Sequence, residues 1–228
     1  MWNNLKKAVT FSYDDGVESD KKLIAILNKY GFRATFNLNS GLIGTPDYWT
    51  CKSFDVRRLS REDVLSLYRG HEVAVHGTLH LHANELGDAA LDEEFGGDKR
   101  ALESLFGVTM RGMAYPYGDC DAPVAASVAR AGLRYGRTVF SSHGFALPED
   151  PILLKPTCHH DDPEVFELID RFLASESNEP QLLYIWGHAY EFDANDNWDR
   201  LEEICRRLSG HPDIFIGTNA EVLLGEVQ

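Results

Sequence analysis

The stretch Ala-Val-Thr-Phe-Ser-Tyr-Asp-Asp-Gly at residues 8–16 joins a short β-rich run to two adjacent carboxylates and a glycine. Its β-branched and aromatic residues predict a strand, and Gly16 predicts a turn directly after it. Adjacent side chains of an extended strand point to opposite faces. At a turn that ends in glycine, both Asp14 and Asp15 can point into one site. Acids that precede a helix also suit its dipole, so the pair alone does not establish catalysis.

Short strands and helices alternate along the rest of the chain. The predicted strands are Ala8–Tyr13, Ala34–Leu38, Glu72–Val75, Gly112–Tyr115, Tyr135–Val139, Ile152–Lys155, Leu182–Trp186 and Ile214–Ile216. The predicted helices are Asp20–Tyr30, one that starts at Ser60, Asp88–Phe106, Pro123–Ala131, Pro163–Leu173, Trp198–Leu208 and Ala220–Leu224. This alternation predicts an α/β fold with a parallel sheet, and the number of strands favours a barrel or distorted barrel over an open sheet.

Composition narrows the classes of function. The 228 residues include 22 Lys and Arg against 36 Asp and Glu, a net charge of −14, which argues against nucleic acid and anionic membrane surfaces as partners. No linker or repeat interrupts the chain, so residues 1–228 are expected to form a single domain. Four scattered cysteines, without a signal peptide or an apolar run of bilayer length, predict a protein of the reducing cytoplasm.

Reactive residues follow five of the predicted strands. In a barrel, chemistry collects at the carboxyl ends of the strands, so these residues are expected to meet in one site. They are Asp14-Asp15-Gly16, His76 with His80, Tyr115-Pro116-Tyr117-Gly118, Cys158-His159-His160-Asp161-Asp162, and His188.

His76 and His80 form an HxxxH pair. Histidines at i and i+4 lie on one face if the segment is helical, which suits a shared metal, although two polar loop histidines are an equal alternative. Catalytic zinc sites use three protein ligands, and Asp15, His76 and His80 would supply them. His82 would point elsewhere on such a helix.

His188, in Trp186-Gly187-His188-Ala189-Tyr190, needs a neighbouring carboxylate to act as an acid. The sequence offers several partners without choosing between them, and His159 and His160 are weaker candidates for the same role. His143 follows two serines, but no GxSxG elbow supports a serine nucleophile. The partner candidates for His188 are Glu191, Asp193, Asp161 and Asp162.

Several of these segments together resemble the polysaccharide deacetylases with a NodB homology domain, carbohydrate esterase family four. Residues 10–16 look like the first motif, which is usually Thr-Phe-Asp-Asp-Gly, and residues 33–39 are similar to the second strand of those enzymes. Residues 71–80 resemble the His-x-x-x-His motif, residues 114–118 the Arg-x-Pro-Tyr motif, and residues 186–188 the final strand that ends in His. The similarity runs from about Val9 to Leu223.

The resemblance implies a distorted (β/α) barrel with fewer than eight complete units, and a metal-dependent hydrolase. Such an enzyme removes N- or O-acetyl groups from a carbohydrate by attack of a metal-bound water. The metal is expected to be zinc, with cobalt or nickel as alternatives. The implied roles are Asp14 as general base, Asp15, His76 and His80 as metal ligands, the Tyr117 N–H in the oxyanion hole and His188 as general acid. Tyr115, Trp186 and Tyr190 offer flat faces for sugar rings, as do Tyr117 and Trp49, although core packing is an alternative for each of them.

Two family features are missing. Ala114 stands where the family has the arginine that orients the base, and Arg111 is near in sequence but not at the matching place. The acidic motif that serves the acid histidine is not recognisable, although residues 158–162 or Glu191 are candidates to replace it. These departures suggest a divergent branch like the deacetylase-like domains of gellan lyases. Two alternatives remain: a hydrolase of small amides, imides or ureides, and a non-catalytic carbohydrate-binding domain.

Overall fold

The computed structural model of the chain describes residues 2–226. Its strands are β1 (Lys7–Asp14), β2 (Thr35–Leu38), β3 (Tyr48–Cys51), β4 (Phe54–Arg57), β5 (Glu72–Val75), β6 (Gly112–Ala114), β7 (Tyr135–Arg137), β8 (Cys158–His159), β9 (Gln181–His188) and β10 (Ile214–Ile216). Its α-helices are α1 (Asp20–Lys29), α2 (Arg61–Leu67), α3 (Asp88–Leu91), α4 (Asp98–Phe106), α5 (Ala122–Arg130), α6 (Val165–Ala174), α7 (Ala189–Asn195), α8 (Trp198–Leu208) and α9 (Asn219–Leu224). A π-helical segment, Asp92–Gly97, joins α3 to α4. The predicted alternation of strands and helices is confirmed.

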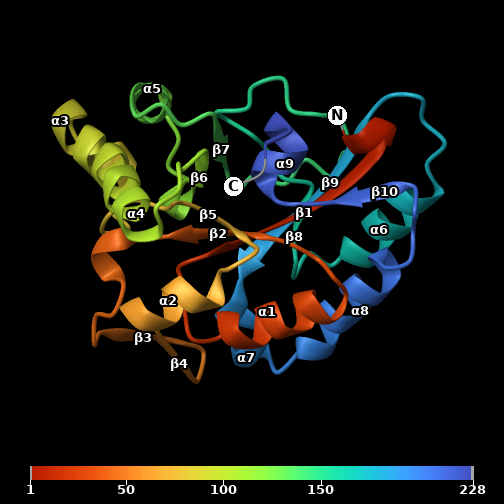
Figure 1. The fold of residues 1–228 in the computed structure, drawn as a ribbon, viewed down its shortest axis with the longest axis horizontal. Helices are drawn as coiled ribbons and strands as arrows, with labels where there is room; N and C mark the ends of the chain where they lie inside the picture. Colours follow the sequence, from red (N-terminus) through yellow and green to blue (C-terminus); the bar gives the residue numbers. More distant parts are fainter. Residues whose placement is uncertain (1, 227–228) are drawn as a thin grey trace.

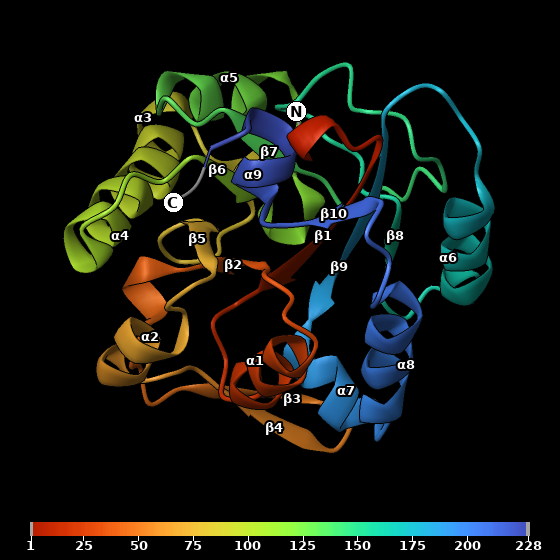
Figure 2. The same ribbon diagram turned by 45° about the vertical axis from the view of Figure 1, so that its right-hand side comes forward.

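All of these strands except β3 and β4 form a curled parallel sheet surrounded by helices (Figures 1 and 2). Its order is β7-β6-β5-β2-β1-β9-β8. The remaining strand, β10, pairs with the start of β1 at residues 7–9, whereas β2 pairs with the end of β1 at residues 12–14. The two edges of this path approach each other through one chain segment, because Leu154 bridges to Arg137 of β7 while Cys158 pairs with Ile185 of β9. The predicted distorted barrel is therefore confirmed.

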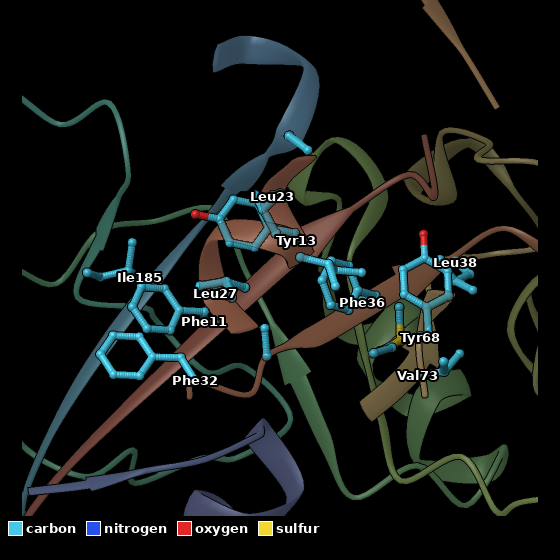
Figure 3. Packing of buried hydrophobic residues seen from close by; sticks show 14 of the residues in the cluster. Phe11, Tyr13, Leu23, Leu27, Phe32, Phe36, Leu38, Tyr68, Val73 and Ile185 are labelled. Carbon is cyan, nitrogen blue, oxygen red and sulfur yellow. The ribbon is translucent and has the colours of Figure 1, made fainter. Parts of the chain in front are cut away.

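Apolar side chains of the strands and of α1 form the main core (Figure 3). Leu23 and Leu27, one helical turn apart on α1, are both fully buried. Phe11 of β1 stacks on Phe32, with ring centroids 5.9 Å apart. Burying side chains of this size stabilises a fold by about 1.5–3 kcal/mol each. This packing fixes β1 and thereby the position of the aspartates at its end.

Several features differ from the sequence prediction: helix α7 was not predicted, and the predicted helix Asp88–Phe106 is interrupted by a π-helical segment. The predicted strand Ile152–Lys155 is wrong, because only Leu154 makes a bridge and the regular pairing begins at Cys158. The antiparallel hairpin β3–β4, with Trp49 paired to Val56, was not predicted, since its exposed polar and aromatic residues lack a clear alternation. The hairpin matters because Trp49 of β3, and Arg58 directly after β4, line the same cavity as Asp14 and Asp15.

Cys51, Cys120, Cys158 and Cys205 are free thiols, and Cys158 and Cys205 are buried. Among the helices of residues 2–226, none combines the length and the apolar composition that a bilayer crossing requires.

Candidate metal and catalytic site

The site lies where β1, β2, β5 and β9 end. Asp14, the last residue of β1, pairs in register with Asn37 of β2 and with His188 of β9. His76 directly follows β5. Because all these strands run parallel, their carboxyl ends bring residues from distant parts of the chain to one edge of the sheet. The convergence predicted from the sequence is thus present.

The chain turns sharply at Asp15 and Gly16. Both residues have positive φ angles, 85° for Asp15 and 65° for Gly16. Asp15 donates its N–H to Asn37 O at 3.0 Å, which holds this residue beside β2. A Cβ at Gly16 would lie 2.9 Å from a Leu38 methyl group. The strained turn allows two adjacent carboxylates to face one site, as the sequence stretch predicts.

Asp15, His76 and His80 offer ligand atoms that all lie within 4.8 Å of one another. The His76 Nδ1–H donates to the Ala114 carbonyl at 2.8 Å, so its Nε2 carries the lone pair. That Nε2 is buried and has no hydrogen-bond partner among the described residues. Burial lowers the pKa of both imidazoles, to about 4 for His80, where His76 adds to the effect. Neutral imidazoles and a carboxylate are the ligand set of a catalytic zinc site.

The segment that carries both histidines is a loop, so the helical HxxxH arrangement is wrong. Gly77 and His80 have positive φ angles of 78° and 56°. The Glu94 carboxylate accepts the N–H groups of Leu79 and Leu81 at 3.1 and 3.2 Å, which holds the loop in place. The two imidazoles nevertheless approach each other, with ring centroids 4.8 Å apart.

Asp14 faces the same site but has an arginine as its partner. Arg137 Nη2 donates to both carboxylate oxygens, at 2.6 Å for Oδ1, and Asn37 Nδ2 donates to Oδ1 at 2.8 Å. Burial alone would raise the pKa of Asp14, but Arg137, His76 and His188 outweigh it and lower the pKa to about 2. Asp14 is therefore ionised at neutral pH.

A second arginine holds Asp15. Arg58 Nη1 contacts the Asp15 carbonyl, and it lies 3.1 Å from Asp15 Oδ1 and 3.0 Å from Asn39 Oδ1. The Arg58 guanidinium also lies over the Trp49 ring, 4.8 Å from its centroid. Each of the two neighbouring aspartates thus has its own guanidinium.

His188 lies on the opposite side of Asp14 from the Asn37 amide. Its Nε2 is 3.8 Å from Asp14 Oδ2, and its Nδ1 is 3.2 Å from Glu191 Oε2. Burial opposes the charged form of His188, but Glu191 outweighs it and raises the pKa to about 9. Of the four predicted partners, Glu191 is the one in contact. His188 is therefore protonated at neutral pH.

Glu191 also contacts the weaker candidates. Its Oε2 lies 3.0 Å from His159 Nε2 and 3.4 Å from His160 Nε2. His160 is fully buried, stacked between Tyr13 and Phe192. His82 stacks on Tyr117 and pairs with Asp119, outside the ligand group, and His143 pairs with Asp162. The structure therefore places His82 and His143 away from the ligand group.

A cavity of about 580 Å³ lies over these groups. Tyr115, Trp186 and Tyr190, the predicted sugar-binding residues, line it, and so do Tyr117 and Trp49. Tyr115 is almost fully buried, with its hydroxyl bonded to the Ile152 carbonyl, so only part of its ring faces the cavity. The Tyr117 side chain is 56% exposed, and its φ of 55° turns the backbone at the rim.

Sequence reasoning missed three polar residues of the site: Arg137, Arg58 and Asn37. Arg137 ends a buried strand, and a charged residue at that place is a signal that could have found it, since an arginine is rarely buried without a partner. Arg58 gave no comparable signal, because its contact depends on the unpredicted hairpin.

The sequence was compared with protein families and with curated proteins. The family described as "Polysaccharide deacetylase" matches residues 3–136, more than half of the chain. No curated protein matches the chain.

Solved structures share the fold at low identity. A family 4 carbohydrate esterase from Streptomyces lividans, in complex with acetate, has 19% identity and a TM-score of 0.58, covering 93% of each chain. The chitin deacetylase of the fungus Colletotrichum lindemuthianum has 17% identity and a TM-score of 0.62, covering 98% of this chain and 90% of its own. A mutant of a family 4 pseudoenzyme with restored activity has 16% identity and a TM-score of 0.58, covering 96% of this chain and 68% of its own. At these identities the likeness concerns the fold alone.

Proposed function

Because the chain belongs to the polysaccharide deacetylase family, we propose that it is a metal-dependent hydrolase that removes N- or O-acetyl groups from a carbohydrate. One observation carries the proposal. Three ligand atoms from Asp15, His76 and His80 lie within 4.8 Å of one another, and a second carboxylate, that of Asp14, lies beside them with its own arginine. A ligand group next to a separate base is what water activation requires.

The donor set fits a divalent cation. His76 Nε2 is a buried lone pair without a hydrogen-bond partner among residues 2–226, which a cation would satisfy. Zinc accepts imidazole nitrogen and carboxylate oxygen, and cobalt and nickel accept the same ligands. Such an ion supplies Lewis-acid polarisation of an acyl carbonyl and lowers the pKa of water. Asp15, His76 and His80 are the residues that would hold it.

The other residues of the site would move the protons. Asp14 accepts a proton from the attacking water, since Arg137 keeps its carboxylate ionised. His188 donates a proton to the departing amine or alcohol as the acyl C–N or C–O bond breaks, and Glu191 stabilises its charged form. The products are acetate and a free amino or hydroxyl group.

The remaining roles concern the acyl oxygen and the sugar. The Tyr117 N–H, at the turned backbone of the rim, would donate to the oxyanion that forms on attack. Trp186, Tyr190 and Trp49 would pack against the faces of sugar rings. The gellan-lyase-associated-like branch rests only on the motif departures at Ala114 and in the acidic motif.

The test measures metal content and acetate release together. Purified protein is loaded with zinc and assayed with N-acetylated oligosaccharides, O-acetylated oligosaccharides, and a panel of small amides, cyclic imides and ureides. Metal-dependent acetate release from an oligosaccharide supports the proposal. Hydrolysis of the small molecules alone would favour the alternative amide hydrolase. Oligosaccharide binding without any hydrolysis would favour a non-catalytic binding domain.

A further inference from the structure

Arg137 lies one strand away from the place where an arginine is missing. Ala114 of β6 and Arg137 of β7 are direct register partners. Partners on neighbouring strands point to the same face of a sheet, and the strands lie about 4.8 Å apart. The long side chain of Arg137 thus extends on the same side as any side chain at Ala114.

We infer that Arg137 is the positioning residue for the Asp14 carboxylate, and that it supplies from β7 the guanidinium that Ala114 of β6 does not provide. The inference rests on the proposed function, in which Asp14 is the general base.

The contact between Arg137 and Asp14 is buried, and a single guanidinium nitrogen makes it. The side chains are 0% and 3% exposed, and Nη2 reaches both carboxylate oxygens. The guanidinium lies 4.2 Å from the centroid of the Trp186 ring, which limits its movement. A charge-assisted contact to both oxygens fixes the orientation of a carboxylate as well as its charge.

The second guanidinium cannot serve Asp14, because Arg58 is bound to Asp15 and Asn39. Without Arg137, the groups left near the Asp14 carboxylate are the protonated His188, with Nε2 at 3.8 Å, the neutral His76, with Nε2 at 3.9 Å, and any cation that the ligand group would hold. Asp14 would then turn towards the ligand group. Arg137 holds it beside that group instead, in the position of a base.

The test compares zinc-loaded wild-type protein with Arg137→Ala, Arg137→Lys and the double variant Arg137→Ala/Ala114→Arg, using an acetylated oligosaccharide that the wild type hydrolyses. For Arg137→Ala we expect kcat to fall about 10- to 100-fold, with KM close to the wild-type value and one ion per chain. The kcat of Arg137→Lys should lie between those of Arg137→Ala and the wild type, since an ammonium group keeps the charge but lacks the planar shape of the guanidinium that packs on Trp186. The double variant should recover most of the lost kcat.

Arg111→Ala is the matched control. Arg111 lies near β6 but pairs with Glu226, and its side chain is 30% exposed, so this variant should keep wild-type kcat. A folded, zinc-loaded Arg137→Ala with wild-type kcat overturns the inference. So does a folded double variant that is no more active than Arg137→Ala. If Arg137→Ala does not fold, the test uses Arg137→Lys in its place. A wild-type kcat in Arg137→Lys would then overturn the inference.

A second readout does not depend on turnover. In the cobalt-substituted protein, the visible absorption spectrum of Arg137→Ala should differ from that of the wild type, because Asp14 turns towards the ion, and the double variant should restore it. An unchanged spectrum in Arg137→Ala overturns the inference. If the wild type releases no acetate from any substrate, the proposed function fails, while this comparison still decides the role of Arg137.

Discussion

The Glu191 carboxylate lies 3.2 Å from Nδ1 of His188, three residues earlier in the chain. His188 ends β9 and Glu191 lies in the first turn of α7, so one continuous stretch supplies both the imidazole and its charge partner. No distant acidic motif is needed for this contact, because the turn of the chain itself brings the two side chains together.

We expect Glu191→Gln to lower kcat about 10- to 100-fold while zinc content stays at one ion per chain. The glutamine removes the charge that raises the pKa of His188 above its ordinary value, and burial then lowers that pKa. The measurement is steady-state acetate release. Glu202→Gln, a substitution at a surface residue paired with Lys29, is the control and should leave kcat unchanged. Wild-type turnover in Glu191→Gln would show that His188 does not depend on this carboxylate.

Replacing any one residue of the ligand group should abolish stoichiometric metal binding. Asp15→Ala, His76→Ala and His80→Ala each remove one of three donors, and two donors hold a divalent ion weakly. Elemental analysis after dialysis measures the ion-to-protein ratio, with His82→Ala as the matched control from the same loop. His82 lies outside the ligand group, paired with Asp119. A full complement of zinc in His76→Ala would contradict the assigned site.

Asp14→Asn separates the base from the ligands. We expect it to keep one ion per chain and to lose turnover by about 100-fold or more, because an amide cannot accept the proton of the attacking water. The substitution leaves Arg137 without its charge partner, so thermal unfolding is recorded to show that the variant is folded. Full activity in this variant would remove the base assignment.

The site illustrates what the sequence predicts and what it does not. Asp14, Asp15, His76 and His188 were predictable, because each lies at the carboxyl end of a strand with a clear β-rich pattern, or directly after it, and parallel strands end on one side. The loop conformation at His80 was not predictable from the local sequence, because it depends on the distant Glu94 carboxylate, which accepts N–H groups of that loop.

Arg137 and Arg58 could not be assigned from the sequence for a related reason. The partner of Arg137 is set by the order and register of seven strands, which place β7 on the far side of β6 from the site. The position of Arg58 depends on an irregular hairpin that has no periodic pattern. Such long-range pairings are decided by the assembled sheet rather than by local sequence.

Asp20 predicts a pH dependence of stability. It is fully buried and accepts hydrogen bonds from the Tyr68 hydroxyl at 2.6 Å and from the Val17 N–H. Burial raises its pKa to about 8, against about 3.9 in the unfolded chain. Between these pH values Asp20 holds a proton in the folded state but not in the unfolded state. The stability that protonated Asp20 contributes is therefore fully present below about pH 4 and is lost as the pH rises to about 8.

Asp20→Asn should therefore gain stability relative to the wild type by up to about 1.4 kcal/mol for each pH unit between 5 and 7. Urea unfolding of both proteins at pH 5, 6 and 7 measures the difference. Asp63→Asn is the control: Ser60 and Lys21 lower the pKa of exposed Asp63, so its titration lies below this range. A constant difference between Asp20→Asn and wild type would rule out a raised pKa at Asp20.

Gly187 directly precedes His188 in β9 and packs against the buried His160 ring. A Cβ at Gly187 would overlap the ring of His160, and that ring cannot move because it is stacked between Tyr13 and Phe192, with centroids 5.8 and 4.1 Å away. Gly187→Ala should therefore cost about 1–3 kcal/mol in the free energy of unfolding and lower kcat by displacing His188.

A double-mutant cycle separates this overlap from a general loss of β9 flexibility. In the His160→Ala background the added methyl group finds open space, so Gly187→Ala should cost much less there than in the wild type. Urea unfolding of the four proteins gives the coupling energy, and zinc content should stay at one ion per chain in each. An equal cost in both backgrounds would mean that the glycine is required by the backbone of β9 rather than by the imidazole behind it.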